Sequence, residues 1–500
     1  MSNVSSKYYG ENGIHRVPLW RIGGYALNNT ATNLYMFMMN YVAYYLTGFV
    51  GVAVVTASSF AMMMRIWDGV TDPVIGLVVD KTNGKFGKNR PFMVIGNIIL
   101  CVTSFILFHV THLLPENIMV RFVFFIIMSA IYYIGYTCQC VVTKSAQTCL
   151  TNDPKQRPLF AIFDGIYNTI LFTVLAIVIG KLSSDAKYGT MYSTDLWHDF
   201  WLMTAIVSAI CTAIAVFSIA PKDRQEFYGT GQAQGKIGIK DYWDTLKGNR
   251  AIQMLIISAS TDKLATSMRV GAVTIVLYGA VAGNYGVING TITGITSLAG
   301  IVLMILGVGT IATRLGQRKA MLIGSWGGII VNIFLILLWL FGDATSMVTG
   351  PTADDKVVFG FFTIAHIVLM VILSFFQGIS GNIVIPMTAD CADYEVYRTG
   401  KYVPGLMGTL FSLVDKLVSS FAPMISGVLF AMVGYKDALP DVNAPYSKGI
   451  HYVAVFLMFG MVIFGLICNV IAMKFYPLTK EKMEEIQEEI AAIKAKAMQQ

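Results

Sequence analysis

Residues 320–342 read AMLIGSWGGIIVNIFLILLWLFG and carry no charged side chain. A helix of about 20 such residues spans the roughly 30 Å hydrocarbon core of a bilayer. Similar uncharged runs lie at 91–115 and 200–220. Over all 500 residues, 55% are hydrophobic, 13% are charged and the mean hydropathy is +0.63. These values exclude a soluble protein and predict a polytopic membrane protein.

The apolar runs recur along most of the chain, interrupted by glycine and proline at tolerable positions. They predict an all-α integral membrane protein with about twelve transmembrane helices. The expected helices lie at 20–47, 51–80, 91–113, 119–150, 157–182, 197–220, 251–282, 288–312, 319–341, 357–394, 403–433 and 450–475.

Lysine and arginine concentrate in the connections that follow even-numbered helices. Cytoplasmic loops carry such an excess, so both termini are expected in the cytoplasm and the protein in the cytoplasmic (inner) membrane. The net charge of +7 then reflects topology and does not indicate a nucleic-acid partner. The basic residues concerned are Lys81, Lys85, Lys88, Arg90, Lys155, Arg157, Lys222, Arg224, Arg314, Arg318, Lys319, Arg398 and Lys401.

The longest polar connection divides the chain into two halves of about six helices each, a pattern typical of transporters with internal repeats. The predicted domains are an N-terminal bundle, a central cytoplasmic loop, a C-terminal bundle and a cytoplasmic tail. Their predicted bounds are 1–220, 221–250, 251–476 and 477–500.

The second predicted helix contains the sequence Arg65-Ile-Trp-Asp-Gly-Val-Thr-Asp72. An ionisable side chain at the bilayer centre costs at least about 2.5–3.5 kcal/mol, so each one is a functional candidate. Arg65, Asp68 and Asp72 share one helix face. Asp68 and Asp72, with the hydroxyl of Thr71, form a candidate metal site for Na⁺, and the same pair could instead carry a proton. Alternatively, Arg65 and the two aspartates neutralise one another as a structural group.

Further polar groups interrupt other predicted helices. Asp262 and Arg269 share a face, beside Lys263, and Asp164 stands among aromatic residues. A pathway with charges of both signs suits a polar, multiply hydrogen-bonding substrate such as a sugar. The candidate substrate residues are Asn29, Gln139, Asp164, Asp262, Lys263 and Arg269. Pairing between helices, which would only hold the bundle together, is the alternative for each of them.

The segment from Arg65 to Gly76, continuing to Pro91, resembles the signature of the glycoside-pentoside-hexuronide cation symporters. The likeness recurs in Leu150–Arg157, Ala389–Tyr394 and Gly405–Lys416. The resemblance implies the major facilitator fold, with two six-helix bundles around a central cavity. It also implies that Asp68 and Asp72 bind the coupling cation and that Lys416 lies near them.

The chain departs from that family at several positions. Asn29 stands where members commonly have an acidic sugar-binding residue, and Cys138 where many have Asp or Asn. Asp164 replaces an expected arginine. Gly135 falls where a hydroxyl ligand of the cation is expected. The resemblance therefore leaves both the sugar and the choice between Na⁺ and H⁺ open.

The sequence thus predicts a secondary active transporter that carries a glycoside, pentoside or hexuronide with Na⁺ or H⁺ by alternating access. No cofactor is expected besides this cation. Two other functions stay open: an intramembrane Mg²⁺-dependent prenyltransferase, suggested by the aspartate pairs at 68/72 and 390/393, and a nutrient sensor that does not transport. The expected partners are the small-molecule substrate and membrane lipid. The oligomeric state is undetermined, and a monomer is compatible with the sequence.

Overall fold

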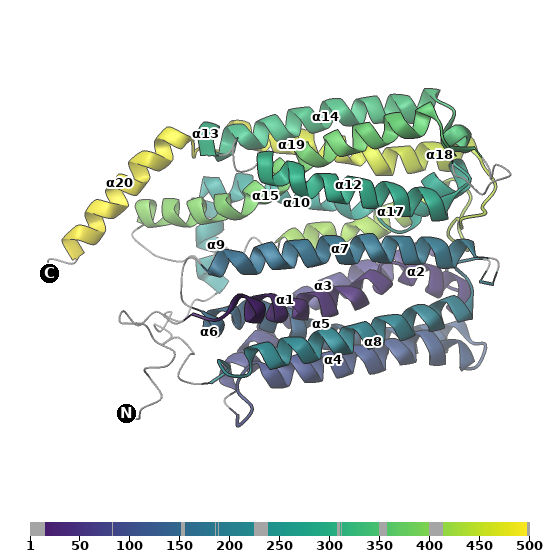
Figure 1. Ribbon diagram of the computed structural model, residues 1–500, viewed down its shortest axis with the longest axis horizontal. Helices are drawn as coiled ribbons and strands as arrows, with labels where there is room; N and C mark the ends of the chain where they lie inside the picture. The colour runs from purple at the N-terminus through teal and green to yellow at the C-terminus, as the bar shows by residue number, and fades with distance from the viewer. Residues whose placement is uncertain are drawn as a thin grey trace. The chain divides into compact units, whose positions relative to one another are not determined.

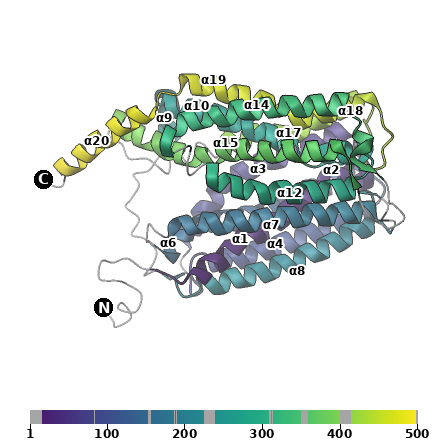
Figure 2. The same ribbon diagram turned by 45° about the horizontal axis from the view of Figure 1, so that its top comes forward.

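Long helices make up nearly all of the computed structural model (Figures 1 and 2). It describes residues 16–82, 84–151, 156–185, 187–188, 190–224, 239–307, 311, 313–349, 358–399 and 414–497. Two compact units divide the chain: unit 1 comprises Met1–Gln234 with Lys436–Leu439, and unit 2 comprises Gly235–Tyr435 with Pro440–Gln500.

Unit 1 is built from six long helices with short helical pieces between them (Figure 1). Helix α1 packs against α7 and α8, and α5 packs against α3 and α4. The bounds are α1 Leu19–Met39, α2 Val42–Tyr45, η2 Leu46–Val50, α3 Val54–Lys81, α4 Arg90–Phe105, η3 Ile106–Val110, η4 Thr111–Leu113, α5 Ile118–Ser145, α6 Gln147–Leu150, α7 Arg157–Ser184 and α8 Thr194–Ile219.

Unit 2 repeats this construction and adds a helix at each end. Helix α10 packs against α19, and α14 packs against α15 and α19. The bounds are α9 Ile239–Gly248, α10 Arg250–Met268, α11 Ala272–Ile275, η6 Val276–Val281, α12 Tyr285–Gly307, α13 Thr313–Leu315, α14 Gln317–Phe341, η8 Ala344–Met347, β1 Val348–Thr349, β2 Val358–Phe359, α15 Phe361–Thr399, α17 Phe421–Met432, α18 Lys448–Val455, η9 Phe456–Gly460, α19 Met461–Phe475 and α20 Lys480–Ala497.

The fold class is confirmed, because every predicted transmembrane segment contains helix in its described part. In the part of the chain that the structure describes, eight helices are long and apolar enough to cross a membrane, or nine if α10 and the bent continuation Ala272–Val281 form one span. Helices α1 and α3 are not among the eight. Helix α1 carries Asn29 among its polar side chains, and α3 carries Arg65, Asp68 and Asp72. Such residues lower the hydropathy of both helices.

The two predicted helices at 20–47 and 251–282 are not continuous, and both break in the same way. After α1, a turn at Asn40 and Tyr41 leads into α2 and the π-helical η2, and α10 is followed by α11 and η6 in the same order. Gly271 has φ +70°, which L side chains rarely adopt, and the chain bends by 46° there. The apolar pattern could not show these breaks, because apolar residues continue on both sides of each one.

A basic turn joins α3 to α4, and Asp223 holds it in place. The Asp223 carboxylate accepts hydrogen bonds from the backbone N–H groups of Lys88, Asn89 and Arg90, at 3.3, 3.1 and 2.9 Å. The Nε of Arg90 adds an ion pair at 3.4 Å. Gly87 has φ +85°, and a Cβ there would collide with Asp223. One buried carboxylate therefore fixes this turn and the start of α4.

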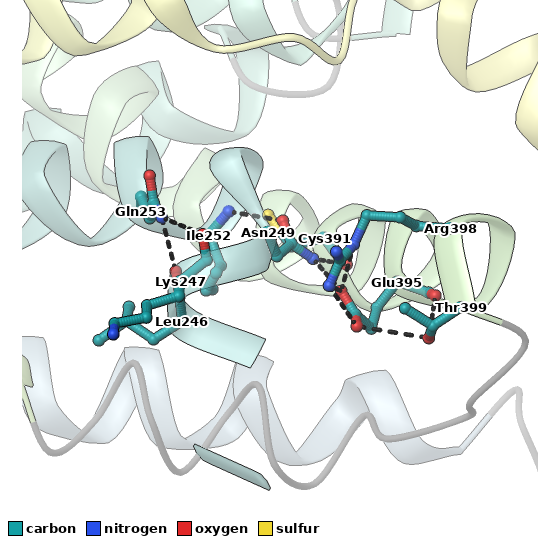
Figure 3. Close-up of polar contacts among 9 residues, drawn as sticks. All are labelled: Leu246, Lys247, Asn249, Ile252, Gln253, Cys391, Glu395, Arg398 and Thr399. Carbon is teal, nitrogen blue, oxygen red and sulfur yellow. Dashed lines mark hydrogen bonds and ion pairs between the residues drawn. The ribbon is translucent and has the colours of Figure 1, made fainter. Parts of the chain in front are cut away.

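In unit 2, Asn249 and Glu395 tie the start of α10 to the end of α15 (Figure 3). Asn249 caps α10 by accepting from Ile252 N, and its Nδ2 donates to Glu395 Oε2 at 3.0 Å. Arg398 pairs with Glu395 at 2.9 Å. The buried Glu395 is thus neutralised where it lies.

The first and last helices of unit 2, α9 and α20, lie in segments for which the sequence predicts a loop and a cytoplasmic tail. Helix α9 lies within the segment predicted as the central loop. The tail pattern predicts a solvated amphipathic helix, and α20 is helical, but Ile486 is fully buried in the same core cluster as Leu478. The apolar side of this helix therefore packs on unit 2.

Candidate functional site

Helix α3 presents Asp68 to two threonine hydroxyls. Asp68 is only 4% exposed and Thr71 only 7%. Thr137 on α5 donates its hydroxyl to Asp68 Oδ1 at 3.1 Å. The Thr71 and Thr137 hydroxyl oxygens are 2.9 Å apart, and Thr71 Oγ1 is 3.0 Å from the Asp68 carbonyl oxygen. Four oxygen atoms from two helices are therefore linked by a chain of short polar contacts in unit 1.

Such a group of oxygens can serve a small hard cation. Carboxylate, hydroxyl and carbonyl oxygens are the ligands that hard ions prefer, and a negative charge buried among them attracts a cation or a proton. Asp68 is the one carboxylate that bonds to these neutral oxygens, and a monovalent ion would balance its single negative charge. Arg65 and Asp72, predicted on the same face, are half-buried on α3.

Asn29 and Asp164, which the sequence proposes as substrate residues, lie together. Asn29 Nδ2 on α1 donates to Asp164 Oδ1 on α7 at 2.7 Å. One turn further along both helices, Asn33 Nδ2 donates to Asn168 Oδ1 at 2.8 Å. These four residues form a two-rung polar ladder between α1 and α7, and Asn29 and Asp164 are both half-buried. Its amide and carboxylate groups offer both donors and acceptors to a polyhydroxylated ligand.

Gln139 is placed apart from this ladder. It is fully buried, and its Nε2 donates to the Met93 carbonyl of α4 at 2.7 Å. Asn28 donates to the backbone oxygen of Gln139 at 3.3 Å and to Thr143 Oγ1 at 2.7 Å. This position in the packing of α1, α4 and α5 favours a structural role for Gln139 over substrate contact.

The predicted charges of unit 2 lie along α10. Arg269, just past its end, donates from Nη1 to Gln377 Oε1 on α15 at 3.1 Å. One carboxylate oxygen of Asp262, Oδ1, is buried and has no hydrogen-bond partner among the described residues. Lys263, by contrast, is exposed. The three residues therefore do not form one closed ion-pair group, although all lie on the segment that the sequence indicates.

Several predictions fall at the edge of the described chain. Lys416 lies in a short helical stretch at 414–419. The family-like motif from Gly405 is outside the described residues up to position 413, as are 152–155 of the other motif and the Lys144 side chain. The expected closeness of Lys416 to Asp68 and Asp72 stays a prediction.

Sequence reasoning missed three members of these sites: Thr137, Asn33 and Asn168. A signal existed for the last two, because each stands four residues after a proposed substrate residue and therefore on the same helix face. The sequence contains a weaker signal for Thr137. Gly135 stands where the family has a hydroxyl ligand. The hydroxyl that donates to Asp68 belongs instead to Thr137, two residues later.

Comparison with known proteins adds a family. Residues 24–480 match the family described as MFS/sugar transport protein. The chain is 27% identical to a glucuronide carrier protein homolog of Escherichia coli, over 94% of this chain and 95% of that protein. It is 23% identical to an isoprimeverose transporter of Lactiplantibacillus pentosus, over 93% and 91% of the two chains. Over a shorter stretch, 27% of this chain and 29% of the relative, it is 30% identical to a putative glycoside/cation symporter of Escherichia coli.

Solved structures with the same fold include the nucleoside transporter NupG, with a TM-score of 0.57 at 13% identity over 91% of this chain and 100% of the other. A proton-dependent oligopeptide transporter structure gives a TM-score of 0.58 at 12% identity, over 94% and 99%. At these identities the likeness concerns the fold alone.

Proposed function

The chain belongs to the MFS/sugar transport protein family, as a member of the glycoside-pentoside-hexuronide cation symporters, and on that premise we propose that it moves a sugar together with a monovalent cation. The observation that carries the proposal is the buried Asp68 carboxylate with the Thr137 hydroxyl 3.1 Å from it. A polytopic protein retains such a group in the membrane at a cost that only a function offsets.

Its family consists of transporters, so the protein is a transporter and the prenyltransferase hypothesis is set aside. A nutrient sensor and a symporter can be told apart by measuring sugar accumulation. The sensor would bind sugar but would not accumulate it when a cation gradient is imposed.

In the proposed mechanism the cation binds Asp68 and Asp72, with the hydroxyls of Thr71 and Thr137 as neutral ligands. The presence of Thr137 supports Na⁺, because a hydroxyl that donates to a carboxylate can turn its lone pairs to an ion instead. A proton would need only a carboxylate. Binding of the cation neutralises Asp68, and this lowers the cost of a conformational change that carries the group through the bilayer.

The sugar, in this proposal, is held in unit 1 by the ladder of Asn29, Asp164, Asn33 and Asn168. Two vicinal hydroxyls of a glycoside or pentoside can replace the amide–carboxylate bond of the first rung, donating to Asp164 and accepting from Asn29, and further hydroxyls can replace the amide–amide bond of the second. For a hexuronide, the substrate carboxylate requires a cationic partner. Lys263 and Arg269 are the predicted substrate residues that carry a positive charge.

Reciprocal tightening couples the two ligands: if the cation stabilises the sugar-binding state by some factor, the sugar raises cation affinity by the same factor. One charge crossing 100 mV releases about 2.3 kcal/mol, which supports roughly fifty-fold accumulation of a neutral sugar.

We place the protein in the cytoplasmic membrane with both termini in the cytoplasm, as the basic loops predict. Alternating access would come from rocking of the two units, a motion that internal repeats support.

The test is uptake of labelled glycosides, pentosides and uronides into membrane vesicles, driven in turn by a sodium and a proton gradient. Wild type should accumulate one class under one gradient, and Asp72→Asn should abolish accumulation. Asp195→Asn, which changes an exposed carboxylate of α8 outside the proposed site, is the matched control. Accumulation by Asp72→Asn at the wild-type level would contradict the assigned role.

A further inference from the structure

Two histidines from distant parts of unit 1 meet at its surface. His109 Nε2 in η3 and His198 Nδ1 in α8 are 2.8 Å apart. The two rings are nearly perpendicular, with their centroids 5.0 Å apart and an interplanar angle of 78°. His198 is exposed and His109 is half-buried. We propose that this pair binds a transition-metal ion of borderline softness, such as Zn²⁺, Cu²⁺ or Ni²⁺, at a site separate from the coupling cation.

The hydrogen bonds of His109 fix the nitrogen that it offers. His109 Nδ1 lies 3.2 Å from the Phe105 carbonyl oxygen. A carbonyl oxygen can only accept, so the proton of a neutral His109 resides on Nδ1 and the lone pair on Nε2 faces His198. Metal-binding histidines almost always donate their other N–H to a carbonyl or carboxylate in this way. His109 is therefore held as a ligand even without a metal.

Only a small movement turns the pair into a two-ligand site. Zinc–nitrogen bonds are about 2.0–2.1 Å long and meet at tetrahedral angles, which puts two ligand nitrogens about 3.3 Å apart. The rings need to separate by about half an ångström from their hydrogen-bonded position. In the hydrogen-bonded pair His198 donates from Nδ1 to His109 Nε2, so metal binding also requires the His198 proton to move to Nε2, an exchange that water permits because His198 is exposed.

Aromatic neighbours orient the His109 ring. Phe105 stacks on it with centroids 4.6 Å apart and 15° between the planes, and Trp201 lies against its edge at 5.2 Å. Trp201 is itself fixed by a hydrogen bond from its Nε1 to Ser104 Oγ at 3.0 Å. A ligand that packing already orients loses less entropy when it binds a metal.

The chemistry of the pair separates it from the carboxylates of the transport site. Imidazole suits Zn²⁺, Cu²⁺ and Ni²⁺, whereas Na⁺, Mg²⁺ and Ca²⁺ prefer oxygen ligands. No group of three or more His, Cys, Asp or Glu side chains that could hold a metal occurs in the described chain, so water would complete the coordination. The ion would link η3 to α8 and stabilise unit 1 against unfolding.

The experiment uses full-length protein in detergent, purified without a polyhistidine tag. Melting temperature is measured with ZnCl₂ or MgCl₂ at equal concentration, then after EDTA. Zn²⁺ should raise the melting temperature of wild type, EDTA should reverse the rise and Mg²⁺ should not reproduce it. His109→Gln and His198→Gln should each weaken Zn²⁺ binding at least ten-fold in titration calorimetry. The matched control His451→Gln, a histidine of unit 2, should keep the wild-type affinity.

Copper supplies a readout that folding defects do not imitate. The paramagnetic resonance spectrum of bound Cu²⁺ should show hyperfine coupling to two imidazole nitrogens in wild type and to one in either variant. Unchanged Zn²⁺ affinity in both histidine variants would overturn the proposal, as would a Cu²⁺ spectrum without nitrogen coupling. So would loss of Zn²⁺ binding in Asp68→Asn, because the ion would then occupy the transport site.

Discussion

The Thr137 hydroxyl is the smallest group on which the proposed cation site depends. It lies between the Asp68 carboxylate and the Thr71 hydroxyl and belongs to a different helix from both. A group in that position aligns the carboxylate when no ion is bound and becomes a ligand when one is. It therefore distinguishes a sodium site from a site that needs only a carboxylate.

Thr137→Val keeps the shape of the side chain and removes the hydroxyl. If Na⁺ is the coupling ion, we expect the half-saturating Na⁺ concentration for sugar uptake to rise about ten-fold, because one ligand and one hydrogen bond to a charge are lost. Thr137→Ser retains the hydroxyl and should stay within about two-fold of wild type. Equal Na⁺ dependence of the valine and serine variants would exclude Thr137 from the site.

Lys222, in the segment after α8, is 1% exposed. Burial, which penalises the charged ammonium, lowers its pKa to about 8 from an ordinary value of 10.5. Between those values the unfolded chain binds a proton that the folded protein has released, so the contribution of Lys222 to stability rises with pH from about 8 to about 10.5. Below pH 8 the buried charge opposes folding in full.

Lys222→Met removes this titration. The melting temperature of wild type minus that of the variant should increase between pH 7.5 and pH 10, because only wild type gains stability there. The exposed Lys474→Met is the control, and its difference from wild type should stay constant over the same range. A constant difference for Lys222→Met as well would mean that this lysine keeps its ordinary pKa.

Among the site residues, those that stand out as charge inside an apolar run were predictable. Asp68, Asp72 and Asp164 could be chosen from the sequence because their burial has a large cost. Their neutral partners could not be chosen in this way. Thr137, Asn33 and Asn168 carry no charge, and threonine and asparagine are common enough in transmembrane helices that only the fold shows which of them face a carboxylate.

At the level of elements, the turn between α3 and α4 has a testable conformation. Gly87 combines a positive φ with close approach to the Asp223 carboxylate, so any side chain there meets both backbone strain and a collision. Gly84 lies in the same turn, but its φ is not positive and a Cβ there would meet only the Gly87 carbonyl, at 3.9 Å.

Gly87→Ala should therefore destabilise the protein by about 1–3 kcal/mol, through strain and through displacement of Asp223 from its backbone donors. Gly84→Ala should change stability by less than about 0.5 kcal/mol. The comparison is made by thermal unfolding in detergent. If both substitutions lower the melting temperature equally, the turn tolerates no added side chain for a reason other than the Asp223 contact.

The existence of the helices was predictable and their interruptions were not. Apolar residues continue on both sides of the breaks that precede α2 and α11, so hydropathy does not show where the helices stop. For the C-terminal tail, the helix was predicted but its burial was not. Its charges predict exposure, yet Ile486 is fully buried in the core of unit 2 and Met483 packs against the same cluster.

Over the whole molecule, length and hydropathy predict the membrane fold, and the match of residues 24–480 to sugar transport proteins gives its family. What the whole chain does with a cation depends on coupling between two binding events. Such coupling is a difference between conformational states, and neither a sequence nor one conformation contains it.

The most direct test of cation-coupled sugar transport is therefore to measure how strongly each ligand changes the affinity for the other. The dissociation constant of the transported sugar is determined for solubilised wild type with and without saturating coupling cation, and that of the cation with and without sugar. The account predicts that each ligand tightens the other by one common factor, roughly 5- to 150-fold, and that Asp68→Asn abolishes the effect. A sugar affinity in wild type that is independent of both Na⁺ and pH would contradict the account.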